Sequence, residues 1–247
     1  MDKPQNCLFF EDFDLIPRPC LRTTQPARAI IMVHIPPSDP RQHDRSNLDM
    51  TEIPEIDPFV IFSQWYDLAC EREHSDPNAF TLATLGTDGF PDGRILLFKH
   101  LDHQGLVFYT NLQSAKGQAL AQNPKASAII HWKSILRQIR IKGVVTQVSD
   151  EEADAYFHSR PRDSQIGAWV SQQSRPLDGR QTLEKALEAT QKRFEDQEVI
   201  PRPNHWSGLR LTPQSIEFWK NGPYRLHFRR VFSRRDNHSW ESHILYP

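Results

Sequence analysis

Basic side chains stand inside several apolar runs of this sequence. Arg94 and Lys99 bound the run RILLFK, and Arg225 and Arg229 bound RLHFR. A cation that faces the interior of a barrel is costly unless an opposite charge pairs with it. We therefore expect these runs to meet a bound anion, with Gln138 of RQIRI as a further polar contact. A regular strand would point Arg94 and Lys99 to opposite faces, so one of the two could lie in solvent.

A second polar cluster lies in the segment YFHSRPRDSQIGAWVSQQS. Arginine grips phosphate through two parallel hydrogen bonds, and hydroxyl and amide groups add further donors. This density of donors indicates a phosphate site, although an ordinary polar surface of a helix and loop has the same composition. The donors are Tyr156, Arg160, Arg162, Ser164, Gln165, Gln173 and Ser174.

Signatures of several other chemistries are missing. No GxGxxG, GxxxxGK[ST], GxSxG or HExxH pattern occurs, which argues against the nucleotide-binding and hydrolytic enzymes that carry them. His100 and His103 fit the turn of a hairpin better than a metal site, so no metal is expected.

The hydrophobic pattern predicts the elements that must position these side chains. Asp57 before Pro58 predicts the start of an amphipathic helix, Ser114 predicts another, and Ser149 with Glu152 forms a capping box for a third. A further helical pattern runs over residues 182–197. Short β-rich runs cover 79–85, 94–101, 106–110, 125–133, 135–148, 208–213, 215–220, 225–235 and 239–247. This order predicts a mainly β fold with flanking helices, built on a small antiparallel barrel.

Composition bounds the class of protein. The 247 residues carry 30 basic and 31 acidic side chains, a formal charge of −1, which argues against binding to nucleic acid or an anionic membrane. Cys7, Cys20 and Cys70 are too scattered for a disulfide framework, and the acidic N-terminus does not fit a secretory signal, so we expect a cytoplasmic protein. We expect residues 1–50 to form a poorly ordered or peripheral arm and residues 51–247 a single domain.

Three stretches resemble a known family. RILLFKHLDHQGLVFYTNLQSAK, YFHSRPRDSQIGAWVSQQS and IEFWKNGPYRLHFR look like those of the pyridoxamine 5'-phosphate oxidase family, in the same order. The resemblance implies an antiparallel Greek-key split β-barrel and a homodimer with FMN at the subunit interface. It also implies oxidation of pyridoxamine 5'-phosphate or pyridoxine 5'-phosphate to pyridoxal 5'-phosphate. A hydride would pass from the substrate to FMN, and dioxygen would then be reduced to hydrogen peroxide.

The resemblance also assigns site residues. Arg225 and His227 would be catalytic, and they would contact the phosphorylated substrate together with Lys99, Tyr156, Arg160 and Ser164. FMN would contact Arg94, Ile95, Leu96, Leu97, Phe98, Lys99, Tyr109, Thr110, Lys116, Gln138, Gln173, Ser174, Trp206 and Arg229.

The sequence departs from the family pattern at particular positions. Ala115 stands where the family has an arginine before Lys116, so FMN is expected to bind more weakly unless Arg137 or another residue compensates. Phe228 stands where the family has an acidic or amide residue, which removes a hydrogen-bond acceptor from the neighbourhood of Arg229. The arginine and tyrosine segment of the family's N-terminal arm has no match in residues 1–50.

Two alternatives remain open at this point. The stretch DMTEIPEIDPFVIFSQWYDLA is similar to the entry segment of the related FMN oxidases of phenazine biosynthesis, whose tricyclic substrate carries no phosphate. The second alternative is a split-barrel protein that binds FMN or pyridoxal phosphate without catalysing a reaction. The cluster of Lys99, Tyr156, Arg160 and Ser164 favours a phosphorylated substrate over a phenazine, because a substrate without phosphate would not need it.

Overall fold

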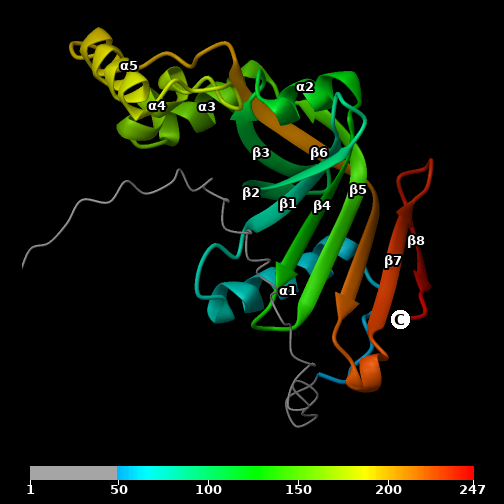
Figure 1. Cartoon of the computed structure of the whole chain (residues 1–247). Helices are drawn as coiled ribbons and strands as arrows, with labels where there is room; N and C mark the ends of the chain where they lie inside the picture. The colour runs from blue at the N-terminus through cyan, green and yellow to red at the C-terminus, as the bar shows by residue number, and fades with distance from the viewer. Residues whose placement is uncertain (1–48) are drawn as a thin grey trace, which may run out of the picture. The chain divides into compact units, whose positions relative to one another are not determined.

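The computed structural model describes residues 49–247, and the strands of this part form one antiparallel sheet. The strand order is β3-β2-β1-β4-β5-β6-β7-β8, and β3 also pairs with β6, so β1 to β6 close into a barrel that β7 and β8 extend (Figure 1). The predicted split barrel with flanking helices is confirmed. The strands are β1 Ala79–Leu85, β2 Pro91–Asp102, β3 Gly105–Asn111, β4 Lys125–Trp132, β5 Arg137–Gln147, β6 Trp206–Lys220, β7 Phe228–Arg234 and β8 Trp240–Ile244.

The predicted helix starts are confirmed. Asp57 accepts a hydrogen bond from the backbone N–H of Phe59, and Ser114 caps the next helix in the same way. Ser149 accepts from Glu152 N, but the Glu152 carboxylate turns to Arg210, so only half of the capping box forms. The helices are α1 Pro58–Arg72, α2 Ala115–Gln122, α3 Asp150–Ser159, α4 Arg162–Val170 and α5 Arg180–Arg193.

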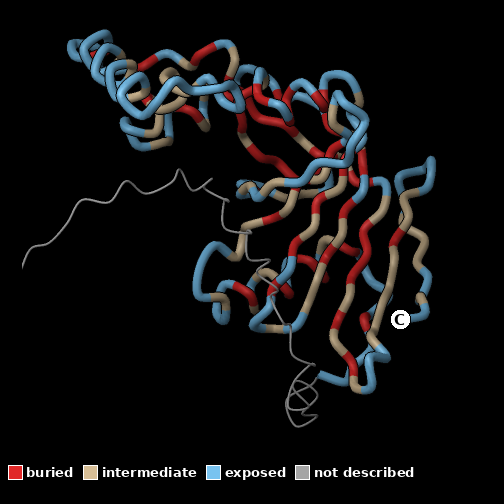
Figure 2. The backbone as a smooth tube through the Cα atoms, in the orientation of Figure 1, coloured by how far each residue is buried: buried red, intermediate tan, exposed pale blue. Residues whose placement is uncertain are grey.

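The core lies between the inward face of the barrel and α1. Side chains of a strand alternate between two faces, and the inward ones, such as Phe80, Ile139 and Phe218, are almost completely buried. Helix α1 packs on this face through Ile61, Phe62, Trp65 and Ala69. Figure 2 shows the buried residues concentrated on the strands and the exposed ones on α5 and the loops. The outward face of the sheet is therefore the one available for a ligand or a second subunit.

Strand β6 runs unbroken over 15 residues, although the sequence predicts two strands that end and begin around Pro213. The register with β5 shifts between Lys142 and Gly143, opposite Pro213. Proline has no N–H for the ladder, and a bulge accommodates it without ending the strand. One strand consequently carries Trp206 at one end and Trp219 near the other.

The prediction of a strand over 225–235 is wrong at its start. Pro223–Arg225 forms a 3-10 turn, and β7 begins only at Phe228. Tyr224 and Arg225 have φ values of 54° and 62°, a left-handed conformation that no strand accepts. Helix α4 was not predicted, and the predicted arm over residues 1–50 lies outside the described residues except for its last two.

Candidate active site

A pocket of about 310 Å³ brings together residues predicted for both cofactor and substrate. It lies between the barrel strands β2, β3 and β6 on one side and α4 with its following loop on the other. The side chain of Asn111 donates to the backbone oxygen of Ser171 at 3.2 Å, which ties that loop to β3. The predicted residues that line the pocket are Leu96, Tyr109, Thr110, Arg160, Ser164, Gln173 and Trp206.

Lys116 stands behind this pocket, in the first turn of α2, with its side chain buried. Its Nζ donates to Gln173 Oε1 at 2.6 Å, to Thr110 Oγ1 at 3.1 Å and to Ser114 Oγ at 3.2 Å. Burial, followed by repulsion from Arg94, lowers the pKa of Lys116 to about 8. All three acceptors are neutral, so an anion at this point would be the charge partner that the ammonium lacks.

Arg160 supplies a second cation to the same pocket. No residue of the described range accepts a hydrogen bond from its buried Nη1. Its guanidinium lies 4.8 Å above the ring centroid of Trp206, and burial lowers its pKa. Tyr109 and Tyr156 stack beside it with ring centroids 3.8 Å apart. A desolvated donor without an acceptor fits a site whose anionic ligand completes it.

Arg94, the first residue of the RILLFK run, is held against β1. Its Nη1 donates to Thr84 Oγ1 at 2.8 Å and to Leu82 O at 3.1 Å, and its Nη2 pairs with Asp92. The side chain is therefore fixed within the sheet, where its charge acts on Lys116.

The rest of this run divides between faces. Leu96 lines the pocket, Ile95 and Leu97 are exposed on the outward face, and Phe98 is buried in the core. The pairing with β3 shifts after Phe98, and Lys99 is exposed beside a different hollow, between β2 and α1. Within one chain, Lys99 is thus not brought together with the other predicted substrate residues.

A second cluster of predicted residues gathers near the far end of β6. Gln138, Trp219 and Arg229 pair in register across β5, β6 and β7, so their side chains share the outward face. The ring of His227 lies 4.7 Å from that of Trp219, and Arg225 is exposed in the preceding turn.

Trp219 is not among the residues predicted from the sequence, yet it is the centre of this cluster. The signal that could have found it is strand alternation, because Phe218 is inward and its neighbour must then face outward.

The structure gives outcomes for two of the three departures from the family pattern, and the third, in the N-terminal arm, lies outside the described residues. Arg137 pairs with Asp49 at 2.9 Å and lies over the ring of Trp65, so within its own chain it does not compensate for Ala115 beside Lys116. Phe228 pairs with Lys220, and its ring is 4.8 Å from the Lys220 ammonium, on the face opposite to Arg229.

The pocket and the Trp219 cluster are far apart in a single chain. Trp206 and Trp219 are 13 residues apart along β6 (206 to 219), which is roughly 40 Å of extended strand. One small ligand cannot touch both clusters of the same chain. Ser174, also predicted for the cofactor, is exposed in the loop after α4 with a φ of 71°.

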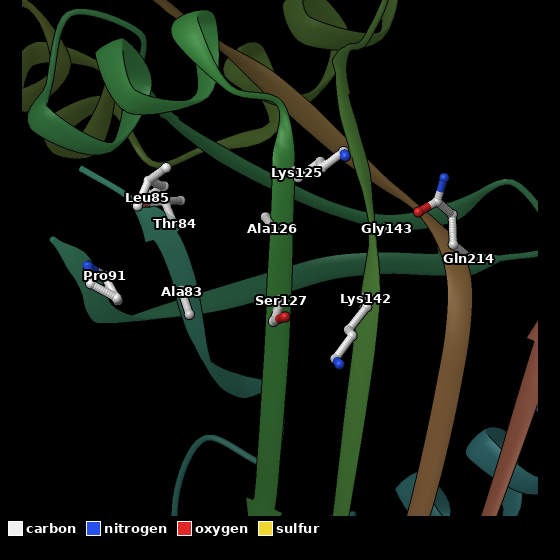
Figure 3. Close-up of a pocket in the computed structure, with 10 residues that line it drawn as sticks. All are labelled: Ala83, Thr84, Leu85, Pro91, Lys125, Ala126, Ser127, Lys142, Gly143 and Gln214. Atoms are coloured by element: carbon white, nitrogen blue, oxygen red, sulfur yellow. The ribbon is translucent and has the colours of Figure 1, made fainter. Parts of the chain in front are cut away.

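Other features of the described residues do not add to this site. A hollow of about 380 Å³ lies on β1, β4 and β5, and no predicted site residue lines it. Figure 3 shows the residues that line it, Lys125 and Lys142 among them. Residues 49–247 contain no grouping of His, Cys, Asp or Glu side chains suited to a metal ion. No helix in this range has the length and apolar character needed to span a bilayer.

The closed barrel, with its cation-lined pocket and its aromatic and arginine cluster, defines a split-barrel protein. It is similar to PhzG of Burkholderia lata, solved in complex with tetrahydrophenazine-1-carboxylic acid, with a TM-score of 0.72 and 29% identity over 78% of this chain and 94% of that one. A pyridoxamine 5'-phosphate oxidase-related, FMN binding protein of Nostoc punctiforme shares the fold at a TM-score of 0.63 and 18% identity, over 78% of this chain and all of that one.

The chain belongs to the pyridoxamine 5'-phosphate oxidase family. Residues 69–194 match the family profile described as pyridoxamine 5'-phosphate oxidase, and residues 206–247 match the pyridoxine 5'-phosphate oxidase C-terminal dimerisation region. A curated pyridoxine/pyridoxamine 5'-phosphate oxidase of Azorhizobium caulinodans is 54% identical over 77% of this chain and 90% of its own length. That of Caulobacter vibrioides is 52% identical over 78% of this chain and 86% of its own. The resemblance carried by the motifs is confirmed.

Proposed function

We propose that this protein is an FMN-dependent oxidase that converts pyridoxamine 5'-phosphate or pyridoxine 5'-phosphate to pyridoxal 5'-phosphate. Relatives that carry the corresponding name are about half identical to it over most of both chains. The observation that carries the proposal is the pair of cations at one pocket, Lys116 with neutral acceptors only and Arg160 with an unpartnered Nη1. Two phosphates, one on a cofactor and one on a substrate, would satisfy both.

The cofactor phosphate fits the Lys116 end of the pocket. Three hydrogen bonds, to Thr110, Ser114 and Gln173, hold the Lys116 ammonium in one position. The flavin would extend along Leu96 and Tyr109, which line the pocket. FMN, when bound, supplies the acceptor for the substrate's hydride and passes the electrons to dioxygen, which leaves as hydrogen peroxide.

The substrate phosphate fits the Arg160 end. Arg160 is fixed over Trp206, and Ser164 lines the same wall of the pocket from α4. Tyr156 stands beside them in the aromatic stack. Guanidinium and hydroxyl donors together suit the oxygens of a phosphate monoester better than an uncharged ring.

The second half of the site is proposed to come from a partner subunit. The match to a dimerisation region indicates a homodimer, and the exposed Ile95 and Leu97 of the outward face would be covered in it. In a symmetric dimer the Trp219 cluster of one chain can meet the pocket of the other, which the length of β6 forbids within one chain. FMN would then lie at the interface.

Arg225 and His227 would act on the reacting end of the substrate. The backbone N–H of Gly222 donates to His227 Nδ1 at 3.3 Å. Since a backbone N–H can only donate, Nδ1 accepts, and Nε2 carries the proton of the neutral ring. His227 can therefore donate from Nε2 to a substrate oxygen or nitrogen, while Arg225 adds a positive charge that orients the substrate.

The similarity to PhzG of Burkholderia lata keeps a phenazine-type substrate as a second candidate. The donors at the Arg160 end support the phosphorylated substrate, because the unpartnered Nη1 of Arg160 and the hydroxyl of Ser164 suit the three terminal oxygens of a phosphate better than the two of a carboxylate. A cytoplasmic location is proposed as well, since the scattered cysteines fit a reducing compartment.

An anaerobic titration tests this function. The protein is loaded with FMN, and its visible absorbance is followed while pyridoxamine 5'-phosphate is added without oxygen. The flavin absorbance should bleach and return when air is admitted, with hydrogen peroxide formed. Bleaching only by a reduced phenazine precursor would favour the second candidate. Flavin binding without bleaching by either compound would mean a non-catalytic FMN protein.

A further inference from the structure

A buried carboxylate lies beside the Trp219 cluster, at Glu217 of β6. Glu217 is 7% exposed and belongs to the outward face, two residues before Trp219. Its Oε1 accepts from Arg229 Nε at 2.9 Å and from Arg229 Nη2 at 2.8 Å. Its Oε2 pairs with Arg140 of β5. One carboxylate thus holds two arginines from the strands on either side.

This contact fixes the Arg229 guanidinium. The remaining terminal nitrogen, Nη1, donates to the backbone oxygen of Tyr246 at 2.8 Å. Because each of the three nitrogens donates a hydrogen bond, the guanidinium is held on the outward face, which it shares with Trp219 and Gln138. Glu217 balances only one of the two arginine charges, so the cluster keeps a net positive charge on the outward face.

Phe228 cannot accept a hydrogen bond from Arg229 in place of Glu217. Phe228 lies on the inward face over Lys220, and neighbouring residues of a strand point to opposite faces. The sequence pattern suggested that Phe228 leaves Arg229 without an acceptor. The acceptor comes instead from the adjacent strand.

We propose that Glu217 is a positioning residue for FMN binding, acting through Arg229. The inference rests on the proposed function, in which the Trp219 cluster of one chain, with Arg229 as a member, borders FMN at the subunit interface. A buried carboxylate bound to two arginines is also a structural element, so the test needs a readout that a purely structural role would not change.

The test is a double-mutant cycle on FMN affinity, measured by quenching of flavin fluorescence. The variants are Glu217→Gln, Arg229→Ala and the double variant, with melting temperatures recorded for each. Glu217→Gln should weaken FMN binding about tenfold or more, because a neutral amide offers a weaker acceptor. In the Arg229→Ala background the same change should have no further effect on FMN affinity, because the residue through which it acts is gone.

Glu241→Gln is the matched control, since Glu241 lies on β8 and pairs with the exposed Arg235. It should leave FMN affinity unchanged. Glu217→Asp serves if the glutamine variant does not fold, and it should give an intermediate affinity with the same non-additivity. Wild-type affinity in the Glu217 variants, or effects that add in the cycle, would overturn the inference. Failure of the wild-type protein to bind FMN would instead reject the proposed function.

Discussion

At the scale of single residues, the protonation of the buried Lys116 amine should respond to anion binding. Three neutral oxygens hold its ammonium, and burial with the nearby Arg94 lowers its pKa to about 8. A phosphate bound next to it would favour the charged form and raise that pKa again. Binding of the anion and uptake of a proton by Lys116 are therefore linked.

The linkage predicts how FMN affinity depends on pH. Below pH about 8, Lys116 is already charged, and affinity should be nearly constant once the FMN phosphate is ionised. Above that pH, binding must first protonate the amine, so affinity should fall. Fluorescence titrations from pH 7 to pH 10 measure it. Lys116→Met should bind about tenfold or more weakly and lose this pH dependence, whereas Lys116→Arg should stay charged throughout. A wild-type affinity that rises with pH would contradict the assignment.

At the scale of elements, α2 carries Lys116 and α4 lines the pocket with Ser164, and each helix contains a glycine in a different environment. A Cβ on Gly117 of α2 would lie 2.1 Å from Leu112 O, a backbone atom that cannot move aside. A Cβ on Gly167 of α4 would meet nothing within 4 Å. Close contact between α2 and the end of β3 is thus what places Lys116 below Thr110.

The same substitution should have opposite effects at these two glycines. Gly117→Ala should lower the free energy of unfolding by about 1–3 kcal/mol through overpacking. Gly167→Ala should raise it by about 0.5–1 kcal/mol, because alanine is the better helix former. Urea unfolding of the cofactor-free protein, followed by circular dichroism, measures both. Equal effects of the same sign would show that the close approach at Gly117 is not a constraint.

At the scale of the whole molecule, β6 separates the two halves of the proposed site. The pocket holds Arg160, and the turn after β6 holds Arg225, at opposite ends of the strand. If each site combines the pocket of one chain with the turn of the other, a chain with a mutated pocket and a chain with a mutated turn can together form one intact site.

Complementation in mixed dimers tests this arrangement. Arg160→Ala and Arg225→Ala are each expected to be nearly inactive as homodimers. A purified mixed dimer of the two has one intact site and one site damaged twice, so it should recover about half of the wild-type activity. A mixed dimer of Arg160→Ala with Ser164→Ala is the control, because both changes fall in the pocket and no site is intact. No recovery in the first mixed dimer would mean that one chain holds a complete site.

The sequence by itself determined the local elements and the family. Local features could be predicted because they depend on residues close together in the sequence. They are the helix caps at Asp57, Ser114 and Ser149 and the alternating runs of the strands. The motif stretches also grouped Arg160 with Ser164, since both lie on one short segment.

Only the tertiary structure decided which side chains meet. The bulge at Pro213 kept β6 continuous, and strand pairing put Trp219 between Gln138 and Arg229 and gave Arg229 its acceptor in Glu217. Left-handed residues at Tyr224 and Arg225 removed the predicted start of β7. These outcomes depend on register and on contacts between residues far apart in the chain, which local spacing does not encode.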